Sequence, residues 1–193
     1  MRLVRPCIAT LAGSMLLSGV ASAQASVQST VSAIPTVSAA LAGSIAVSVD
    51  AGAIQALGNV SDNVVNSFPS PVRITLTWDL HPSTGAVQVI GYFSDPAAAM
   101  ISGPELIPSS WLKGRVLTVG VQGAPTTFTA FTQNAVGGVG IPGGSLSLAT
   151  QPVLGYSKTG TLTFDLDLQL DLTGRVLAAG TYGGVLNIRA VTQ

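Results

Sequence analysis

Three aspartates on one alternating segment have the spacing best suited to chemistry. Asp165, Asp167 and Asp171 lie within residues 161–172, where polar and apolar residues alternate without a break. In a strand they share one face, with i and i+2 neighbours about 7 Å apart. Paired carboxylates can hydrolyse a glycoside, and a row of them can share calcium. A regular wet sheet face offers neither a cleft nor a proton donor, so we expect these residues to keep the face soluble.

Other reactive groups are scarce in this chain. His81 is the only histidine and precedes Pro82 in a predicted turn, while Glu105 is the only glutamate. No Gly-x-Ser-x-Gly sequence supports a nucleophilic serine, and the single cysteine, Cys7, lies near the N-terminus. We therefore predict a protein that is not an enzyme, with no catalytic residue, no cofactor and no metal site.

One aromatic residue in a predicted loop is a candidate for ligand contact. Trp111 lies in a predicted loop, residues 103–114, that also contains Pro104 and Pro108. Its ring can stack on a sugar, or it can close the end of a hydrophobic core. The sequence leaves both roles open.

The N-terminus has the pattern of a secretory signal peptide. Arg2 and Arg5 precede a mostly apolar stretch, residues 8–20, and Ala21-Ser22-Ala23 is a small-residue cleavage site. We predict that residues 1–23 are removed, that the mature chain begins at Gln24, and that it has no integral membrane span. The protein is then secreted, to the periplasm, the outer surface or the extracellular medium.

Composition restricts the partners of the mature chain. Charged residues are only 8% of the sequence, and loss of two of the eight basic residues leaves six against eight acidic ones. The absence of a basic track argues against nucleic acid. Low charge fits either an exported β-protein with hydroxyl-rich outer faces or a subunit covered by copies of itself.

Strand patterns separated by turns predict the fold. Residues 161–172 and 72–80 alternate most clearly, and residues 86–94 follow the second of these as the expected partner of a hairpin. We expect Trp78 to face the core. Further strands are predicted at residues 41–50, 115–121, 126–133, 145–149, 153–156 and 182–191. The fold class is therefore all-β, an immunoglobulin-like antiparallel β-sandwich, over residues 41–193.

Three segments give weaker signals. Residues 24–40 are rich in Ser, Ala and Val and predict an extended N-terminal arm, in which Val27, Val31 and Ala33 share one parity. Residues 51–68 suggest a helical turn or a loop. Residues 134–144 contain five glycines and one proline, which predicts a flexible loop.

The last two strands carry a resemblance. The ending "AAGTYGGVLNIRAV", together with "VRITLTWDL", "GYFSDPAAAM" and "PSSWLKG", resembles secreted bacterial β-sandwich proteins. These include spore-coat-U-like and archaic chaperone–usher pilin-like subunits and WxL-type surface domains. The pilin-like resemblance implies donor-strand assembly, in which the N-terminal arm of one subunit fills a groove in the next. It assigns Gly180, Thr181 and Tyr182 to the start of the terminal strand.

These observations lead to one expected function and one alternative. We expect an exported structural or cell-surface protein, pilin-like and self-assembling, whose partners are copies of itself or other envelope proteins. The alternative is a carbohydrate- or surface-binding β-sandwich module that contacts a glycan through Trp111 and the glycine-rich loop.

Overall fold

The computed structural model describes residues 25–34, 42–81, 85–135, 138–154 and 158–193. The predicted signal peptide and its cleavage site lie outside the described residues, as do residues 35–40 of the predicted arm. Within the described part of the chain, no helix has the length and apolar character needed to cross a membrane.

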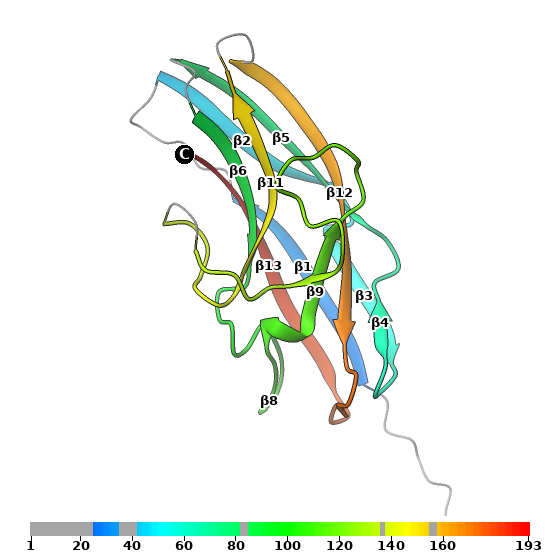
Figure 1. Cartoon of the computed structure of the whole chain (residues 1–193). Helices are drawn as coiled ribbons and strands as arrows, with labels where there is room; N and C mark the ends of the chain where they lie inside the picture. The colour runs from blue at the N-terminus through cyan, green and yellow to red at the C-terminus, as the bar shows by residue number, and fades with distance from the viewer. Residues whose placement is uncertain (1–24, 35–41, 82–84, 136–137, 155–157) are drawn as a thin grey trace, which may run out of the picture.

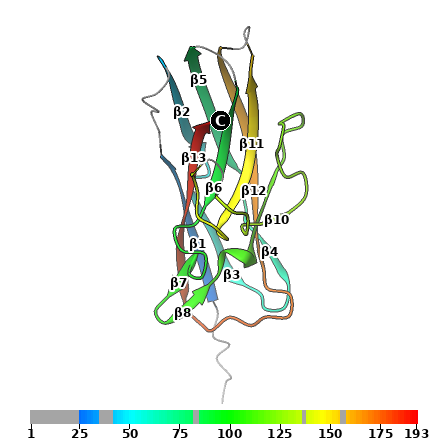
Figure 2. The same ribbon diagram turned by 60° about the vertical axis from the view of Figure 1, so that its left-hand side comes forward.

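Two packed sheets form an elongated sandwich (Figures 1 and 2). The first, sheet A, has the order β11 (Ser145–Val153), β6 (Gly85–Tyr92), β13 (Thr181–Thr192), β1 (Ala25–Ile34) and β3 (Ile54–Val60), with β7 (Met100–Ser102) and β8 (Glu105–Ile107) beside β13. The second, sheet B, has the order β10 (Thr129–Ala130), β9 (Leu112–Val116), β12 (Thr159–Asp171), β5 (Val72–His81) and β2 (Ala42–Ala51), with β4 (Val65–Ser67) beside β12. The β1–β13 pair is parallel, and the other described pairs are antiparallel. The all-β, two-sheet prediction is confirmed.

The leucine face of β12 supplies much of the core. Phe164, Leu166, Leu168 and Leu170 are each at most 4% exposed, while the intervening polar residues face outward. Each buried side chain of this size contributes roughly 1.5–3 kcal/mol. Trp78 on β5 is also in the core, 8% exposed, as the alternation predicts. These two strands therefore place their apolar and polar faces as the sequence indicates.

The predicted hairpin between residues 72–80 and 86–94 is wrong. β5 pairs with β12 and β2 in sheet B, whereas β6 pairs with β11 and β13 in sheet A. Consecutive strands thus belong to different sheets. The reason is visible in β6, where five consecutive residues from Val87 to Gly91 are buried. A strand that is covered on both faces requires a position inside the fold.

Several other segments also differ from expectation. Residues 51–68 contain strands β3 and β4 in place of a helical turn or a plain loop. The two strands predicted at 115–121 and 126–133 are reduced to β9 and the two-residue β10. The strand expected at 145–149 continues to Val153 as one element, β11, with a register irregularity between Ser147 and Ala149. Residues 155–156 of the strand expected at 153–156 lie outside the described residues.

The predicted N-terminal arm is extended and lies within sheet A. β1 runs between β13 and β3, with Val31 opposite Leu186. Val31 is 3% exposed, as the shared parity of the arm's apolar residues indicates, while Gln28 and Thr30 are exposed. The Val31 amide donates to the Ala53 carbonyl at 2.8 Å. This half of the arm is thus an interior strand of the chain's own sandwich.

Candidate functional site

The start of β13 is fixed by a buried tyrosine. Tyr182 is fully buried, and its hydroxyl donates to the Ala178 carbonyl at 3.0 Å. Burial raises the pKa of the Tyr182 hydroxyl, and the nearby negative charge of Glu105 adds to this shift. At Gly180, a Cβ would collide with the Ser102 hydroxyl. The Gly-Thr-Tyr sequence therefore meets a packing requirement, with Thr181 as the first residue of the strand.

Next to this start, β13 is bordered by β1 on one side and by only short pairings on the other. Beyond Asn187, where β6 ends, the remaining pairing partner is β7, through Gly183 and Ile101. A groove of about 310 Å³ opens at this point, and its walls include Phe93, Ala98 and Val185. Ile101 and Val185 are each 47% exposed. The groove can accept an apolar side chain, and its lining also includes the polar residues Ser94 and Asp95.

The aspartate row on β12 is paired with cations from both neighbouring strands. Asp165 accepts two hydrogen bonds from Arg73 of β5, at 2.9 and 3.0 Å. Asp167 turns to Arg115 of β9 on the opposite side, at 3.0 Å. Each carboxylate thus has its own counter-ion and does not share a ligand with the next aspartate.

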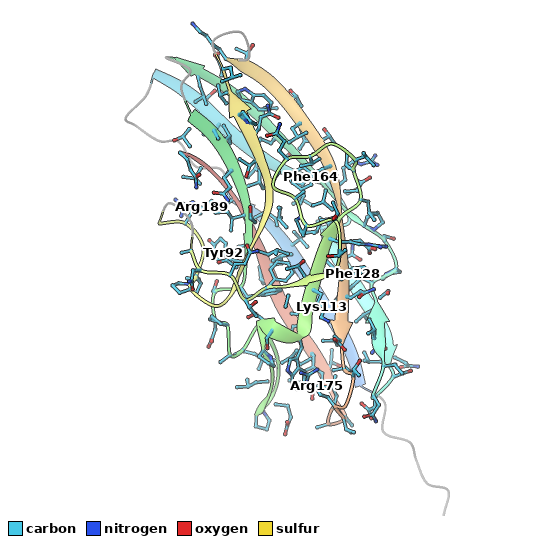
Figure 3. All side chains as sticks on the ribbon, viewed as in Figure 1. Tyr92, Lys113, Phe128, Phe164, Arg175 and Arg189 are labelled. Carbon is cyan, nitrogen blue, oxygen red and sulfur yellow. The ribbon has the colours of Figure 1, made fainter. Side chains whose placement is uncertain are left out.

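Asp171, the last of the row, follows the same rule. Its carboxylate accepts from Lys113 Nζ at 2.7 Å and from the Thr173 amide at 2.9 Å (Lys113 is labelled in Figure 3). These bonds, that of Lys113 first, hold the pKa of Asp171 well below its usual range. The Arg73 guanidinium likewise lowers the pKa of Asp165. Among the described residues, no three His, Cys, Asp or Glu side chains gather as metal ligands.

A second polar chain extends this face toward β2. Asp50 accepts hydrogen bonds from the hydroxyls of Thr75, at 2.5 Å, and Ser48, at 2.8 Å. Thr75 also contacts the Thr163 hydroxyl at 2.8 Å. These bonds, that from Thr75 first, lower the pKa of Asp50. The outer face of sheet B is therefore a network of hydroxyls and neutralised charges with no open carboxylate pair among the residues that the structure describes.

Trp111 closes one end of the sandwich. It ends the short 3₁₀ turn η1 (Ser109–Trp111), packs against the core and is only partly exposed. The guanidinium carbon of Arg175 lies 4.7 Å from the centre of its ring. Figure 3 shows Arg175 at this end of the molecule. The arginine, to which no sequence pattern pointed, occupies a ring face that a sugar would need.

The glycine-rich loop covers the outside of β6. Val139 is 5% exposed, and Ile90 of β6, which faces outward from the sheet, is fully buried. The Ser145 hydroxyl bonds both the amide and the carbonyl of Ile141, each at 2.8 Å, and the Ser109 hydroxyl donates to the Gly143 carbonyl at 3.2 Å. The described part of the loop, residues 138–144, is therefore tied to the fold. Neither this part of the loop nor Trp111 lines the groove beside β13 or the pocket formed by residues 115–121 and Thr126.

His81 and Glu105, the remaining candidates for chemistry, are far apart in the topology. His81 is the last residue of β5 in sheet B, and Glu105 opens β8 beside sheet A, where it is exposed.

No protein-family model matches the chain, and no curated protein matches it. The geometry alone must therefore support any function.

Proposed function

We propose that the protein is an exported structural component of the cell surface that acts by contact, not by turnover. In this proposal it is an immunoglobulin-like sandwich that self-assembles by donating its N-terminal strand β1 to a second copy. One observation carries the proposal: the strand nearest the N-terminus lies in the interior of a sheet. β1 is bonded on both edges, to β13 in parallel register and to β3 in antiparallel register.

Strand exchange from this arrangement would require no new kind of contact. In an exchanged oligomer, β1 from one copy makes with its neighbour the contacts that it makes here within one chain. β1 also lacks charged residues along its length. Its removal from one subunit would open both β13 and β3, so an empty groove would strongly favour refilling.

The side chains at the other candidate positions also support this proposal. The β12 aspartates are neutralised by Arg73, Arg115 and Lys113, which favours a structural role for that face. Trp111 packs beneath Arg175, which disfavours sugar stacking. Neither observation favours the glycan-binding alternative.

A disulfide lock tests the proposal in the full chain with Cys7→Ser. Gln28 and Gly183 are register partners on β1 and β13, and both are exposed. Adjacent-strand positions lie within disulfide reach, so Q28C/G183C should hold β1 in its own subunit when oxidised. When this variant is oxidised as a monomer, we expect no filaments by electron microscopy and no species larger than a dimer by size exclusion, whereas the reduced variant should form filaments.

A matched lock elsewhere controls for the disulfide itself. Thr77 and Thr161 are exposed register partners on β5 and β12, away from β1. Oxidised T77C/T161C should assemble like the reduced protein. Filaments formed by Q28C/G183C that was oxidised as a monomer would reject strand donation, and a protein that stays monomeric even when reduced would reject self-assembly.

A further inference from the structure

The four lateral edges of the two sheets are not equally protected. Open strand edges invite pairing with another chain, and proteins cover or distort them. At β11, the Gln133 amide donates to the Ser145 carbonyl at 2.8 Å, and the Thr150 amide donates to the Gln122 carbonyl at 2.7 Å. The same strand carries Pro152, which has no amide hydrogen. This edge is closed by its own loops.

Two other edges are also protected. β9 is covered by β10 and by a hydrogen bond from the Val116 amide to the Pro125 carbonyl at 2.8 Å. β3 is short and irregular, with Gly58 at φ +61° beside the register shift between Val27 and Gln28 of β1. A bulge of this kind twists an edge away from flat pairing.

Along residues 42–49, the fourth edge, β2, has no such protection from the residues that the structure describes; its bulge lies beyond Val49. It is ten residues long, ends sheet B and pairs with β5 without irregularity up to Val49. Asp50 is its one charged residue and lies at the end of the regular stretch. It contains neither proline nor lysine. By the rules that govern strand edges, β2 is built to accept a partner.

Hydrogen-bond directions show which backbone groups β2 presents. The Leu80 amide of β5 donates to the Lys158 carbonyl, next to β12, at 2.9 Å. The backbone N–H and C=O groups of successive residues point to opposite sides of a strand. Since Leu80 points toward β12, Thr75 and Thr77 point their backbone groups toward β2. Their register partners there are Ser48 and Ala46.

In an antiparallel pair, two residues that lie opposite each other exchange both backbone hydrogen bonds or none. The residues of β2 that alternate with Ala46 and Ser48 therefore point their backbone N–H and C=O groups away from β5. These are Ile45 and Val47, whose side chains are each 5% exposed and face the core. Their N–H and C=O groups point toward the free edge. No backbone hydrogen bond to either group comes from the loop and turn segments that the structure describes.

We propose that this edge binds a second copy of the chain, with two β2 strands paired antiparallel about a two-fold axis at Val47. The β-branched residues of β2 are placed symmetrically about this residue. The axis sets Ile45 opposite Val49 of the other copy and Ala46 opposite Ser48. Every β-branched residue then faces another, which favours cross-strand packing.

Charge also favours this register over its neighbour. With the axis at Val47, Asp50 lies opposite a serine, Ser44, and the two Asp50 side chains lie at opposite ends of the ladder. An axis at Ala46 would set Val49 opposite Gly43 and leave Asp50 opposite Ala42. A shift of the second strand by a single residue would place its core-facing side chains on the solvent face of the sheet, so this register is excluded. The Val47 axis also makes sheet B continuous through both copies.

This contact rests on the proposed self-association, but it uses a different surface from β1. The β2 edge is the same whether β1 fills its own subunit or another one. Strand donation makes a head-to-tail chain of subunits, whereas the β2 contact joins two copies symmetrically. The two contacts can therefore fail independently.

Cysteine cross-linking tests the β2 contact in the full chain with Cys7→Ser. Ala46 and Ser48 face outward, and in the proposed register each lies opposite the other in the second copy, in a pair without hydrogen bonds, where Cβ atoms are closest. The variant A46C/S48C should form a covalent dimer on mild oxidation, seen on a non-reducing gel. Within one chain, i and i+2 positions are too far apart to bridge.

Single variants control for register and for random collision. In A46C, the introduced thiols of the two copies would lie on a diagonal of the ladder, beyond disulfide reach, and the same holds for S48C. Neither A46C nor S48C alone should therefore give a disulfide-linked dimer. If oxidised A46C/S48C runs as a monomer on the non-reducing gel, the proposal is overturned. If A46C alone gives a disulfide-linked dimer, the Val47 register is overturned.

A charge variant measures the contact without cross-linking. In the oxidised Q28C/G183C chain, where β1 is held in its own subunit, A46K/S48K sets lysine opposite lysine across the axis and should shift sedimentation from dimer to monomer. T77K places the same charge on the same exposed face one strand further in, and should remain a dimer. Dimers that survive A46K/S48K would contradict the β2 contact. If A46C/S48C cross-links while oxidised Q28C/G183C still forms filaments, only strand donation fails. If A46C/S48C does not cross-link while the oxidised lock abolishes filaments, only the β2 contact fails.

Discussion

Arg175 lies over the indole of Trp111, with its guanidinium carbon 4.7 Å from the ring centre, and also donates through Nη1 to the Asp171 carbonyl at 3.2 Å. One arginine thus connects the turn after β12 to the η1 turn before β9. The sandwich end is closed by this cation–π contact, and the same contact hides the aromatic face that the sequence offers for binding.

Removal of this arginine should expose Trp111 and loosen the end of the sandwich. We expect Arg175→Ala to lower the free energy of unfolding by about 0.5–1 kcal/mol, the usual size of such a contact, and to shift the tryptophan emission to longer wavelength. Urea titration and fluorescence measure both effects. Arg175→Lys, which keeps the charge, should lie between. If Arg175→Ala leaves both stability and emission unchanged, the contact does not hold this end of the fold.

The two faces of β12 should respond in opposite ways to substitution. Leu168 is 4% exposed, so Leu168→Asp places an unpaired carboxylate in the core and should prevent folding. Asp167→Asn removes only a surface ion pair with Arg115 and should change stability by about 0.5 kcal/mol or less. Circular dichroism and urea titration check both. A stable Leu168→Asp variant beside an unfolded Asp167→Asn variant would invert the assigned faces.

The contrast between β12 and β6 shows where sequence reasoning succeeds. β12 has water on one face and the core on the other, so strict alternation identified the strand, its direction of burial and its polar face. β6 is buried on both faces beneath Val139 and its loop. Alternation then carries no information about partners, and the short spacing to β5 suggested a hairpin that the structure does not have.

Long-range contacts account for what the sequence left open at the site. Arg175 and Trp111 are separated by 64 positions, and no local pattern joins them. The cations that neutralise the β12 aspartates come from β5 and β9, which only the sheet order brings together. Likewise, the arm showed its apolar parity in sequence, but its place between β13 and β3 depends on tertiary pairing.

β1 should contribute to stability through its inward face. Val31 is 3% exposed in the core, so Val31→Ala should cost roughly 1–3 kcal/mol through lost burial and the cavity left behind. Thr30, next to it, is exposed, and Thr30→Ala should be nearly neutral. Thermal or urea unfolding of both variants makes the comparison. Equal stabilities would mean that β1 does not pack in a folded sandwich.

The Lys113–Asp171 pair predicts acid sensitivity. The pKa of Asp171 is lower in the folded chain than its ordinary value of about 3.9. Its contribution is therefore complete above that ordinary value and is lost as the pH falls toward the lower folded-state pKa. For a partly exposed pair, the loss should be about 1 kcal/mol or less.

Urea titrations between pH 6 and about pH 2.5 check this, with Asp171→Asn as the reference. The variant should be less stable near neutral pH, and the difference should shrink as the pH falls. A difference that stays constant with pH would show that the carboxylate's charge does not stabilise the fold.

Tyr182 should make the fold sensitive to alkali. Burial raises the pKa of its hydroxyl in the folded chain above the ordinary value of about 10. Above that pH the unfolded chain loses the proton more readily than the folded one, so stability should decline as the pH rises.

Tyr182→Phe keeps the ring in the core but removes the hydrogen bond to Ala178, which should cost about 1 kcal/mol at neutral pH. Since phenylalanine does not titrate, the variant should also lose part of the alkaline destabilisation. Urea titrations at pH 7 and about pH 10.5 measure the two effects, and identical alkaline slopes for the two proteins would contradict a buried, protonated Tyr182 at the start of β13.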